Sequence, residues 1–117
     1  FTGMFETALE DDEIIESISF SKPTKANYVK FPNPASRYAM VGVFVAQFGE
    51  GVRVAVTGAS EGGVFRHEEM ETALSSNYSA DSLSSLNVAS DGLISDLHAS
   101  AEYRANLIKE MTKRAVV

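Results

Sequence analysis

The sequence contains no cysteine. Without thiols the chain forms no disulfide framework, no thiolate metal site, no cysteine nucleophile and no cysteine-ligated iron–sulfur cluster. The absence fits a reducing compartment, and we expect a cytoplasmic location.

Long apolar runs and an excess of basic residues are also lacking. The longest apolar run, Ala39 to Ala46, has the length of a strand and falls far short of the ~20 residues of a membrane span. No basic segment followed by an apolar stretch marks a signal peptide at the N-terminus. The formal net charge is -6, and an acidic surface disfavours phosphate binding. We therefore expect neither a nucleic-acid partner nor a membrane span.

The chain has the size and composition of one soluble domain. Its 117 residues, 44% of them hydrophobic and 22% charged, suit a single core. It begins with Phe1 rather than methionine, and Phe5 follows closely. We interpret residues 1–117 as a single domain that is a fragment of a larger protein.

The first half of the chain predicts strands separated by turn signals. Pro32-Asn33-Pro34 predicts an extended or turning segment, and Gly49-Glu50-Gly51 predicts the turn of an antiparallel hairpin. The runs with strand composition or alternation are Ile14 to Phe20, Tyr28 to Phe31, Tyr38 to Phe48, Val52 to Thr57 and Val64-Phe65. An antiparallel sheet is therefore expected over residues ~13 to 66.

From Glu68 onward the apolar residues recur at helical spacing. Helices are predicted at 68–76 and 101–115, the second capped by Ser100, and Ser79 is a candidate cap for a short helix between them. Strands followed by helices indicate an α+β fold. We expect an antiparallel sheet of three to four strands followed by a small cluster of about three helices.

No motif in the sequence provides a catalytic set. His67 and His98 lie outside metal-binding spacings, and carboxylate pairs such as Glu68-Glu69 fall at turns or helix starts. The Gly58 to Gly63 loop matches no phosphate-binding spacing and carries an acidic residue. We expect no catalytic residue and no metal in this chain. A hydrolase that uses a carboxylate pair has no motif to support it.

Arg37 and Tyr38 are the most promising pair for binding. They directly follow Pro34-Ala35-Ser36, so a loop constrained by proline presents an arginine and a tyrosine together. Such a pair can face a ring-shaped ligand. The alternative, which the composition leaves equally open, is that Tyr38 packs against a neighbouring strand as a half-buried residue.

Several stretches of the chain form a recognisable ordered set, and the most recognisable is the strand–loop–strand from Lys30 to Val43. The others are Phe1 to Leu9 with Glu13 to Ile15, Val52 to Ala59 with Gly63 to Arg66, and Asp96 to Arg104 with Arg114-Ala115. Taken in order, these stretches resemble the C-terminal domain of the FAD-binding (medium) subunit of molybdenum hydroxylases of the carbon monoxide dehydrogenase and xanthine dehydrogenase type.

The resemblance implies a role in electron transfer. In this family electrons pass from molybdenum through two 2Fe–2S clusters to FAD. The C-terminal domain closes over the isoalloxazine and contacts partner subunits, which carry the iron–sulfur clusters and the molybdopterin. Gly-rich loops in the N-terminal FAD-binding portion of the same subunit hold most of the FAD, and this sequence lacks them. The chain would then be part of an oxidoreductase, inactive alone, with weak or no FAD binding of its own.

By matching position, the resemblance implies that Tyr38 lies against the flavin ring, with Lys30 and Arg37 near the flavin or the electron acceptor. The competing interpretation is a stand-alone protein-binding or dimerisation module that uses its sheet face. FAD binding by a longer protein would distinguish the two.

Overall fold

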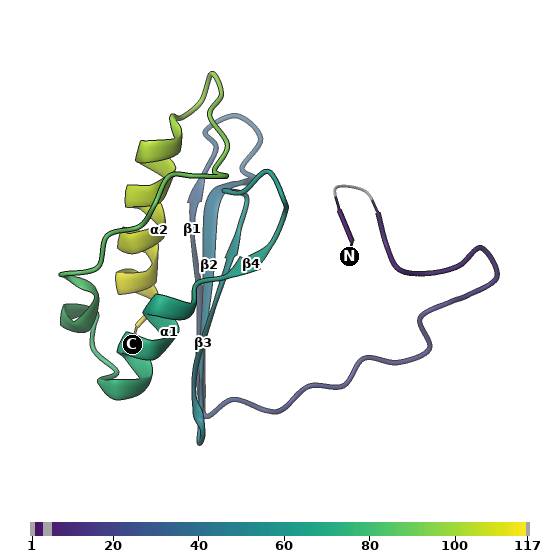
Figure 1. The fold of residues 1–117 in the computed structure, drawn as a ribbon, viewed down its shortest axis with the longest axis horizontal. Coiled ribbons are helices and arrows are strands. Elements are labelled where there is room, and N and C mark those ends of the chain that lie inside the picture. The colour runs from purple at the N-terminus through teal and green to yellow at the C-terminus, as the bar shows by residue number, and fades with distance from the viewer. Residues whose placement is uncertain (1, 4–5, 117) are drawn as a thin grey trace.

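The computed structural model describes residues 2–3 and 6–116. Phe1, Met4 and Phe5, which belong to the first stretch of the resemblance, lie outside these residues, as does Val117. The elements are β1 (Lys25–Pro32), β2 (Ala39–Phe48), β3 (Gly51–Thr57), β4 (Phe65–Arg66), α1 (Glu68–Ser76), the 3-10 turn η1 (Ala80–Leu83) and α2 (Ala101–Ala115). Helices cover one face of a single sheet (Figure 1), which confirms the predicted α+β class.

The sheet is an antiparallel meander with the strand order β1-β2-β3-β4. Phe48 pairs with Gly51, so Gly49 and Glu50 form the tight turn between β2 and β3 and the predicted hairpin is confirmed. Gly51 has a φ of 143°, a conformation that costs little without a Cβ atom. Every strand therefore pairs with the strand next to it in the sequence.

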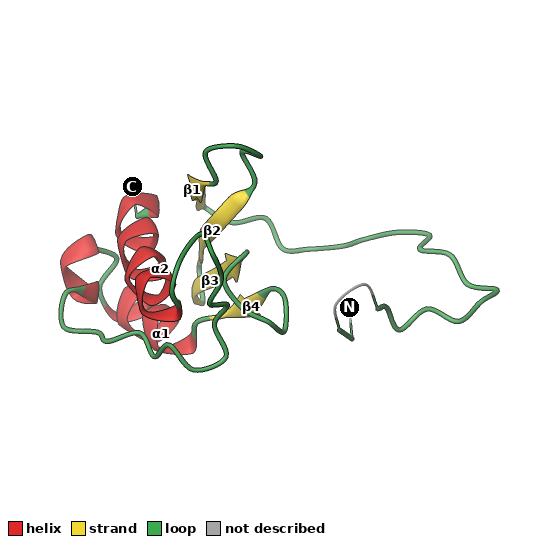
Figure 2. Cartoon of the chain, turned by 90° about the horizontal axis from the view of Figure 1, so that it is seen from above, coloured by secondary structure: helices red, strands yellow, loops and turns green. Residues whose placement is uncertain are grey.

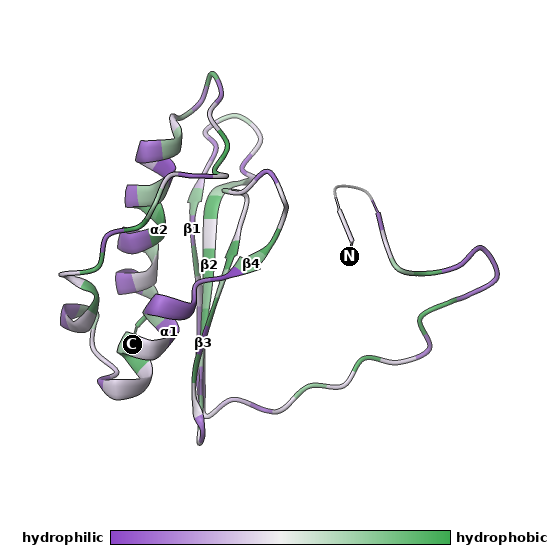
Figure 3. Ribbon diagram, in the orientation of Figure 1, coloured by the Kyte–Doolittle hydropathy of each residue, from purple (hydrophilic) through white to green (hydrophobic). Residues whose placement is uncertain are grey.

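The core lies between the sheet and the helices. Alternate residues of β2 and β3 point toward the helices, as the period of two in a strand requires. In Figure 3 hydrophobic residues run along β2, while hydrophilic residues recur along α2. Burying each large apolar side chain stabilises the fold by ~1.5–3 kcal/mol. The large apolar side chains that are fully buried include Val41, Val43, Val45, Val52, Val54, Val56, Met70, Leu74, Leu83, Ile108 and Met111.

Both predicted helices are confirmed, with the expected bounds. The Ser100 hydroxyl accepts a hydrogen bond from the Tyr103 N–H at 3.2 Å and so caps α2. The Ser79 hydroxyl caps η1 by accepting from the Asp81 N–H at 3.3 Å. The short third helix of the prediction is thus a single 3-10 turn that ends at Leu83. In the described part of the chain, no helix is long and apolar enough to span a bilayer.

The strand predicted at Ile14 to Phe20 is wrong. These residues form no strand, and the sheet begins only at Lys25. Ile14, Ile18 and Phe20 are 87%, 78% and 84% exposed. The segment runs away from the sheet (Figures 1 and 2), so its β-branched residues meet no pleated surface on which strand propensity could act.

Removing apolar side chains from this segment should leave the domain as stable as before. We expect Ile18→Ser and Phe20→Ser to change the free energy of unfolding by less than about 0.5 kcal/mol, as for other exposed sites. Ile108→Ala, in the core, should cost about 2–5 kcal/mol. Urea unfolding followed by circular dichroism measures all three. A loss above ~1 kcal/mol for Phe20→Ser would show that the segment packs on the domain in solution.

Candidate functional site

The loop between β1 and β2 is held together by its own hydrogen bonds. The Asn33 N–H donates to the Tyr38 carbonyl at 2.7 Å, and the Arg37 N–H donates to the Asn33 carbonyl at 2.9 Å. The Asn33 side-chain oxygen also accepts from the N–H groups of Ala35 and Ser36, at 3.0 and 3.3 Å. Asparagine commonly organises turns in this way. The loop therefore has a defined conformation.

Tyr38 stands at the end of this loop, immediately before β2. Its N–H donates to the Ser36 hydroxyl at 3.3 Å, which ties the backbone to the loop. Its side chain is 81% exposed. Of the two alternatives for Tyr38, packing against a neighbouring strand is therefore not what the structure shows. The ring is presented to solvent on an ordered backbone.

Lys30, near the end of β1, and Arg37, in the loop, contribute in different ways. The Lys30 ammonium donates to the Arg37 carbonyl at 2.9 Å and so braces the loop against the end of β1. Arg37 has a φ of 64°, in the left-handed region that residues other than glycine seldom adopt. Both residues are exposed. Arg37 directly precedes Tyr38 in the sequence, and Lys30 is bonded to the Arg37 carbonyl. Their role toward a ligand stays a prediction.

A cavity of about 260 Å³ lies beside Tyr38. Three segments line it: the Asn33 to Tyr38 loop, the end of β3 at Gly58, and the residues before α2, which include Asp96 and His98. Arg104 of α2 also lines it. The aromatic ring, carboxylate and imidazole thus come from distant parts of the sequence.

A buried arginine joins these three segments. Arg104 is 3% exposed, and its Nη1 donates to the Met40 carbonyl at 2.7 Å and the Gly58 carbonyl at 3.2 Å. Its Nη2 donates to both carboxylate oxygens of Asp96 at 2.9 Å. Arg104 is not among the residues predicted to form a site. The sequence does carry a signal for its burial, because helical spacing places it on the same face as Ile108.

The carboxylate of Asp96 is held by backbone groups as well as by Arg104. The backbone N–H groups of His98 and Ala99 donate to Asp96 Oδ1 at 2.9 and 3.1 Å. The His98 N–H is the main cause that lowers the pKa of Asp96 below its ordinary value, with further contributions from the Ala99 N–H and the Arg104 guanidinium. Asp96 therefore stays ionised where it pairs with Arg104. The part of His98 that takes part is its backbone N–H.

The start of β2 and the end of β3 approach each other closely at Gly58. Gly58 has a φ of 75°, and a Cβ atom there would lie 2.3 Å from the Ala39 carbonyl oxygen. Real Cβ atoms essentially never come so close to backbone. Because Ala39 directly follows Tyr38, this contact fixes where the Tyr38 loop enters the sheet.

Replacing Gly58 by alanine should destabilise the domain through both strain and this clash. Gly92 is a matched control, because its φ of 72° is similar but nothing lies within 4 Å of its Cβ position. We expect Gly92→Ala to cost about 1 kcal/mol from its φ alone, and Gly58→Ala to cost about 2–3 kcal/mol or more. Thermal unfolding of both variants compares them. Equal losses would mean that the Ala39 contact contributes nothing.

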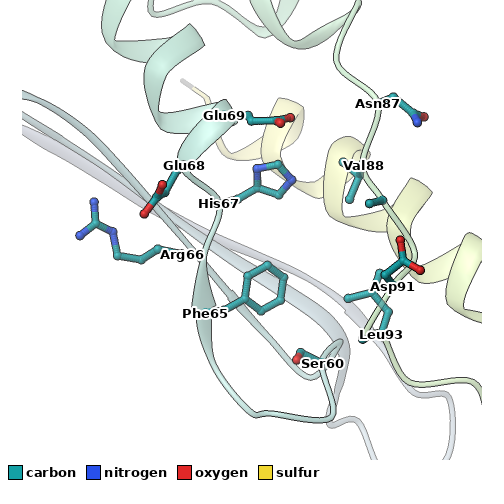
Figure 4. Close-up of a pocket in the computed structure, with 12 residues that line it drawn as sticks. Ser60, Phe65, Arg66, His67, Glu68, Glu69, Asn87, Val88, Asp91 and Leu93 are labelled. Atoms are coloured by element: carbon teal, nitrogen blue, oxygen red, sulfur yellow. The ribbon is translucent and has the colours of Figure 1, made fainter.

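A larger cavity of about 460 Å³ lies where β4 meets α1 (Figure 4). Phe65, His67, Glu69 and Asp91 are among the residues that line it. His67 occupies the N-cap position of α1 without making a side-chain capping bond. Among the residues that the structure describes, no cluster of His, Asp and Glu side chains could hold a metal ion.

Next to this cavity, α1 provides a hydrogen-bond acceptor for a backbone N–H of β3 that has no strand partner. Strand β4 pairs only with Ala55 and Val56, so the Val54 N–H lacks a strand partner and donates instead to Glu71 Oε1 at 3.0 Å. Glu71, 7% exposed, also forms a bidentate ion pair with Arg66, whose Nε donates to Oε1 at 2.7 Å. The Arg66 hydrogen bond is the main cause that lowers the pKa of Glu71. The carboxylate therefore links α1, β3 and β4.

Protonating Glu71 should weaken the fold. Its pKa is lowered on folding, so its contribution is present above the ordinary value of 4.5 and is lost as the pH falls through the folded pKa. Glu71→Gln should cost about 1–3 kcal/mol at pH 7 and should flatten the fall in stability on acidification, whereas exposed Glu69→Gln should do neither. Urea titrations between about pH 7 and 3 measure this. Parallel curves for the wild type and Glu71→Gln would contradict the assignment.

Comparison with known proteins gives one informative similarity. No family model matches the sequence, and no solved structure matches it. The chain is 33% identical, over 127 aligned positions, to the nicotine 6-hydroxylase medium subunit of Paenarthrobacter nicotinovorans. The alignment covers the whole chain and 44% of that relative, so the chain spans less than half of the relative's length. The entire chain is therefore similar to one part of a hydroxylase medium subunit.

Proposed function

We propose that this chain is the part of a molybdenum hydroxylase flavoprotein subunit that closes over the isoalloxazine ring of FAD. The observation that carries the proposal is the 33% identity to a hydroxylase medium subunit along the whole chain. The relative is more than twice as long as the matched part, which leaves room for a separate portion that holds the rest of the FAD. The chain on this view is one domain of a larger subunit.

The residues of the chain suit one face of a flavin ring. Tyr38 offers an exposed ring on an ordered loop, and aromatic rings stack on one another with ~0.5–1.5 kcal/mol beyond the area buried. The Gly58 to Gly63 loop matches no phosphate-binding spacing and carries Glu61, which would repel a pyrophosphate. The chain therefore fits the ring and not the whole dinucleotide.

Bound FAD would supply the electron-accepting chemistry, and the residues of this chain would shape its surroundings. Tyr38 would cover the ring and keep water from it. Lys30 would hold the loop through its bond to the Arg37 carbonyl, which leaves the Arg37 side chain beside Tyr38, near the flavin or the acceptor. Electrons would reach the flavin from molybdenum and iron–sulfur centres in partner subunits, as the family resemblance implies.

The face of the sheet opposite the helices would provide the contact with the rest of the subunit. Phe44 and Tyr28 pair across β2 and β1 on this face and are 41% and 46% exposed. Their neighbours Val43 and Val45 point the other way, into the core. The same exposed face is what a stand-alone binding or dimerisation module would use, so this second candidate function needs its own test.

Removing the Tyr38 ring should alter the flavin and spare the fold. In the full-length subunit we expect Tyr38→Ala to lower FAD content or shift the flavin potential, while Tyr38→Phe keeps most of the ring's effect. Because Tyr38 is exposed in the 117-residue domain, Tyr38→Ala should change the free energy of unfolding of that domain without FAD by less than about 0.5 kcal/mol. Tyr103→Ala is the control, since Tyr103 packs edge-on against Phe31 with ring centroids 6.3 Å apart. It should lower the melting temperature and leave the flavin potential unchanged.

Two results would overturn the proposal. The first is an unchanged flavin content and potential in Tyr38→Ala. The second is a full-length subunit that binds no FAD but associates in a way that Phe44→Ser abolishes, which sedimentation velocity would reveal. That outcome would establish the binding or dimerisation module instead.

A further inference from the structure

We propose that Arg104 is a positioning residue for Tyr38: from α2 it sets the place and mobility of the Tyr38 ring without touching it. The inference deepens the proposed function and rests on it only where the flavin is concerned. The bonds that carry it run from the Arg104 guanidinium to Met40, Gly58 and Asp96.

Two carbonyl groups that follow the Tyr38 side chain along the backbone are fixed by hydrogen bonds. The first, the Tyr38 carbonyl itself, accepts from the Asn33 N–H at 2.7 Å. Two residues further on, the Met40 carbonyl accepts from Arg104 Nη1 at 2.7 Å. The first bond closes the loop, and the second anchors the loop to the helical layer. Without the second bond the loop keeps its internal shape but loses its attachment to α2.

The same guanidinium fixes the other walls of the cavity beside Tyr38. Nη1 also reaches the Gly58 carbonyl at 3.2 Å, at the point where Gly58 approaches Ala39. Nη2 donates to both carboxylate oxygens of Asp96, and Asp96 Oδ1 also accepts from the His98 N–H. One side chain therefore aligns all three segments that border the Tyr38 ring, and a shift of Arg104 shifts them together.

Only arginine can make this set of contacts. Its planar guanidinium has five donors in a fixed fork, whereas a lysine ammonium is a compact point charge. Arg104→Lys retains the positive charge near Asp96 but cannot also bridge the Met40 and Gly58 carbonyls. The substitution therefore shows whether the charge of residue 104 is enough or whether its bridging hydrogen bonds are needed.

A fluorescent probe at position 38 tests the positioning role directly. The sequence has no tryptophan, so Tyr38→Trp introduces one fluorophore into the 117-residue chain at an exposed site. In that background Arg104→Lys should lower the amplitude of the slow component of the fluorescence anisotropy decay, which reports tumbling of the whole molecule, and add a faster component, because the loop becomes mobile on the nanosecond timescale. Arg114→Lys, an exposed site on the same helix, is the matched control and should leave the decay unchanged.

The measurement is made well below the melting temperature, with circular dichroism as a check on folding. If Arg104→Lys does not fold, Asp96→Asn takes its place, since an asparagine oxygen can still accept from the His98 N–H while the ion pair is lost. An unchanged anisotropy decay in a folded variant overturns the positioning role, because a purely structural arginine lowers stability alone.

The full-length subunit separates this inference from the proposed function. Arg104→Lys should shift the flavin potential in the same direction as Tyr38→Ala, and the double variant should shift it no further than Tyr38→Ala alone. A shift with Tyr38→Ala but none with Arg104→Lys overturns the positioning role and leaves the proposed function standing. Faster anisotropy decay with no flavin effect from either substitution leaves the positioning role standing and overturns the flavin contact.

Discussion

Backbone N–H and C=O groups that leave water must find hydrogen-bond partners, and this requirement organises the packing of helices on the sheet. The sheet is small, and β4 covers only part of β3. The helices therefore contribute polar side chains to the strands in addition to apolar ones. Ser75 and Glu71 of α1 accept from the N–H groups of Val52 and Val54, at 2.9 and 3.0 Å. Arg104 of α2 donates to carbonyl groups near the ends of β2 and β3.

The Glu71 and Arg104 side chains have opposite charges, and they bind opposite kinds of backbone group. The Glu71 carboxylate accepts from the Val54 N–H on the open edge of β3, and the Arg104 guanidinium donates to the carbonyls of Met40 and Gly58, near the strand ends. A buried charge that lacked a partner would cost several kcal/mol, and each of these has an ion-pair partner, Arg66 or Asp96. The partners are partly exposed, so each pair runs from the core to the surface. The sheet is therefore bonded to the helices at two separate points, to α1 through Glu71 and to α2 through Arg104.

The sequence predicts those elements whose signals are local. Helix bounds at Ser100 and the turn at Gly49-Glu50 depend on a few adjacent residues, and both are confirmed. Ile14 to Phe20 has the composition of a strand, but a strand also needs a neighbour, and no local pattern reports whether one exists. The prediction there is wrong, and those at Ser100 and Gly49-Glu50 are correct, because all of them use local sequence signals alone.

The candidate site follows the same division. Pro34 and the residues around it predict a constrained loop that ends at Tyr38, and the structure shows that loop. Its setting could not be predicted, because Gly58, Asp96 and Arg104 reach it from three other segments. Arg104 also interrupts a mostly apolar helix face, and this pattern indicates that Arg104 is buried but does not identify its partner. The roles of Tyr38, Lys30 and Arg37 toward FAD still rest on the resemblance.

The meander topology has a consequence for the order in which the molecule assembles. Each strand pairs with its neighbour in sequence, so the sheet can form from short-range contacts, which close quickly. Helix α2 instead packs on β1 and β2, which lie far back in the chain. During synthesis the valine side chains of β2 therefore stay exposed to solvent until α2 has left the ribosome. In that interval they can associate with other exposed apolar surfaces and aggregate. Because the same helix carries Arg104, the Tyr38 loop acquires its final place only in this last step, when the core closes.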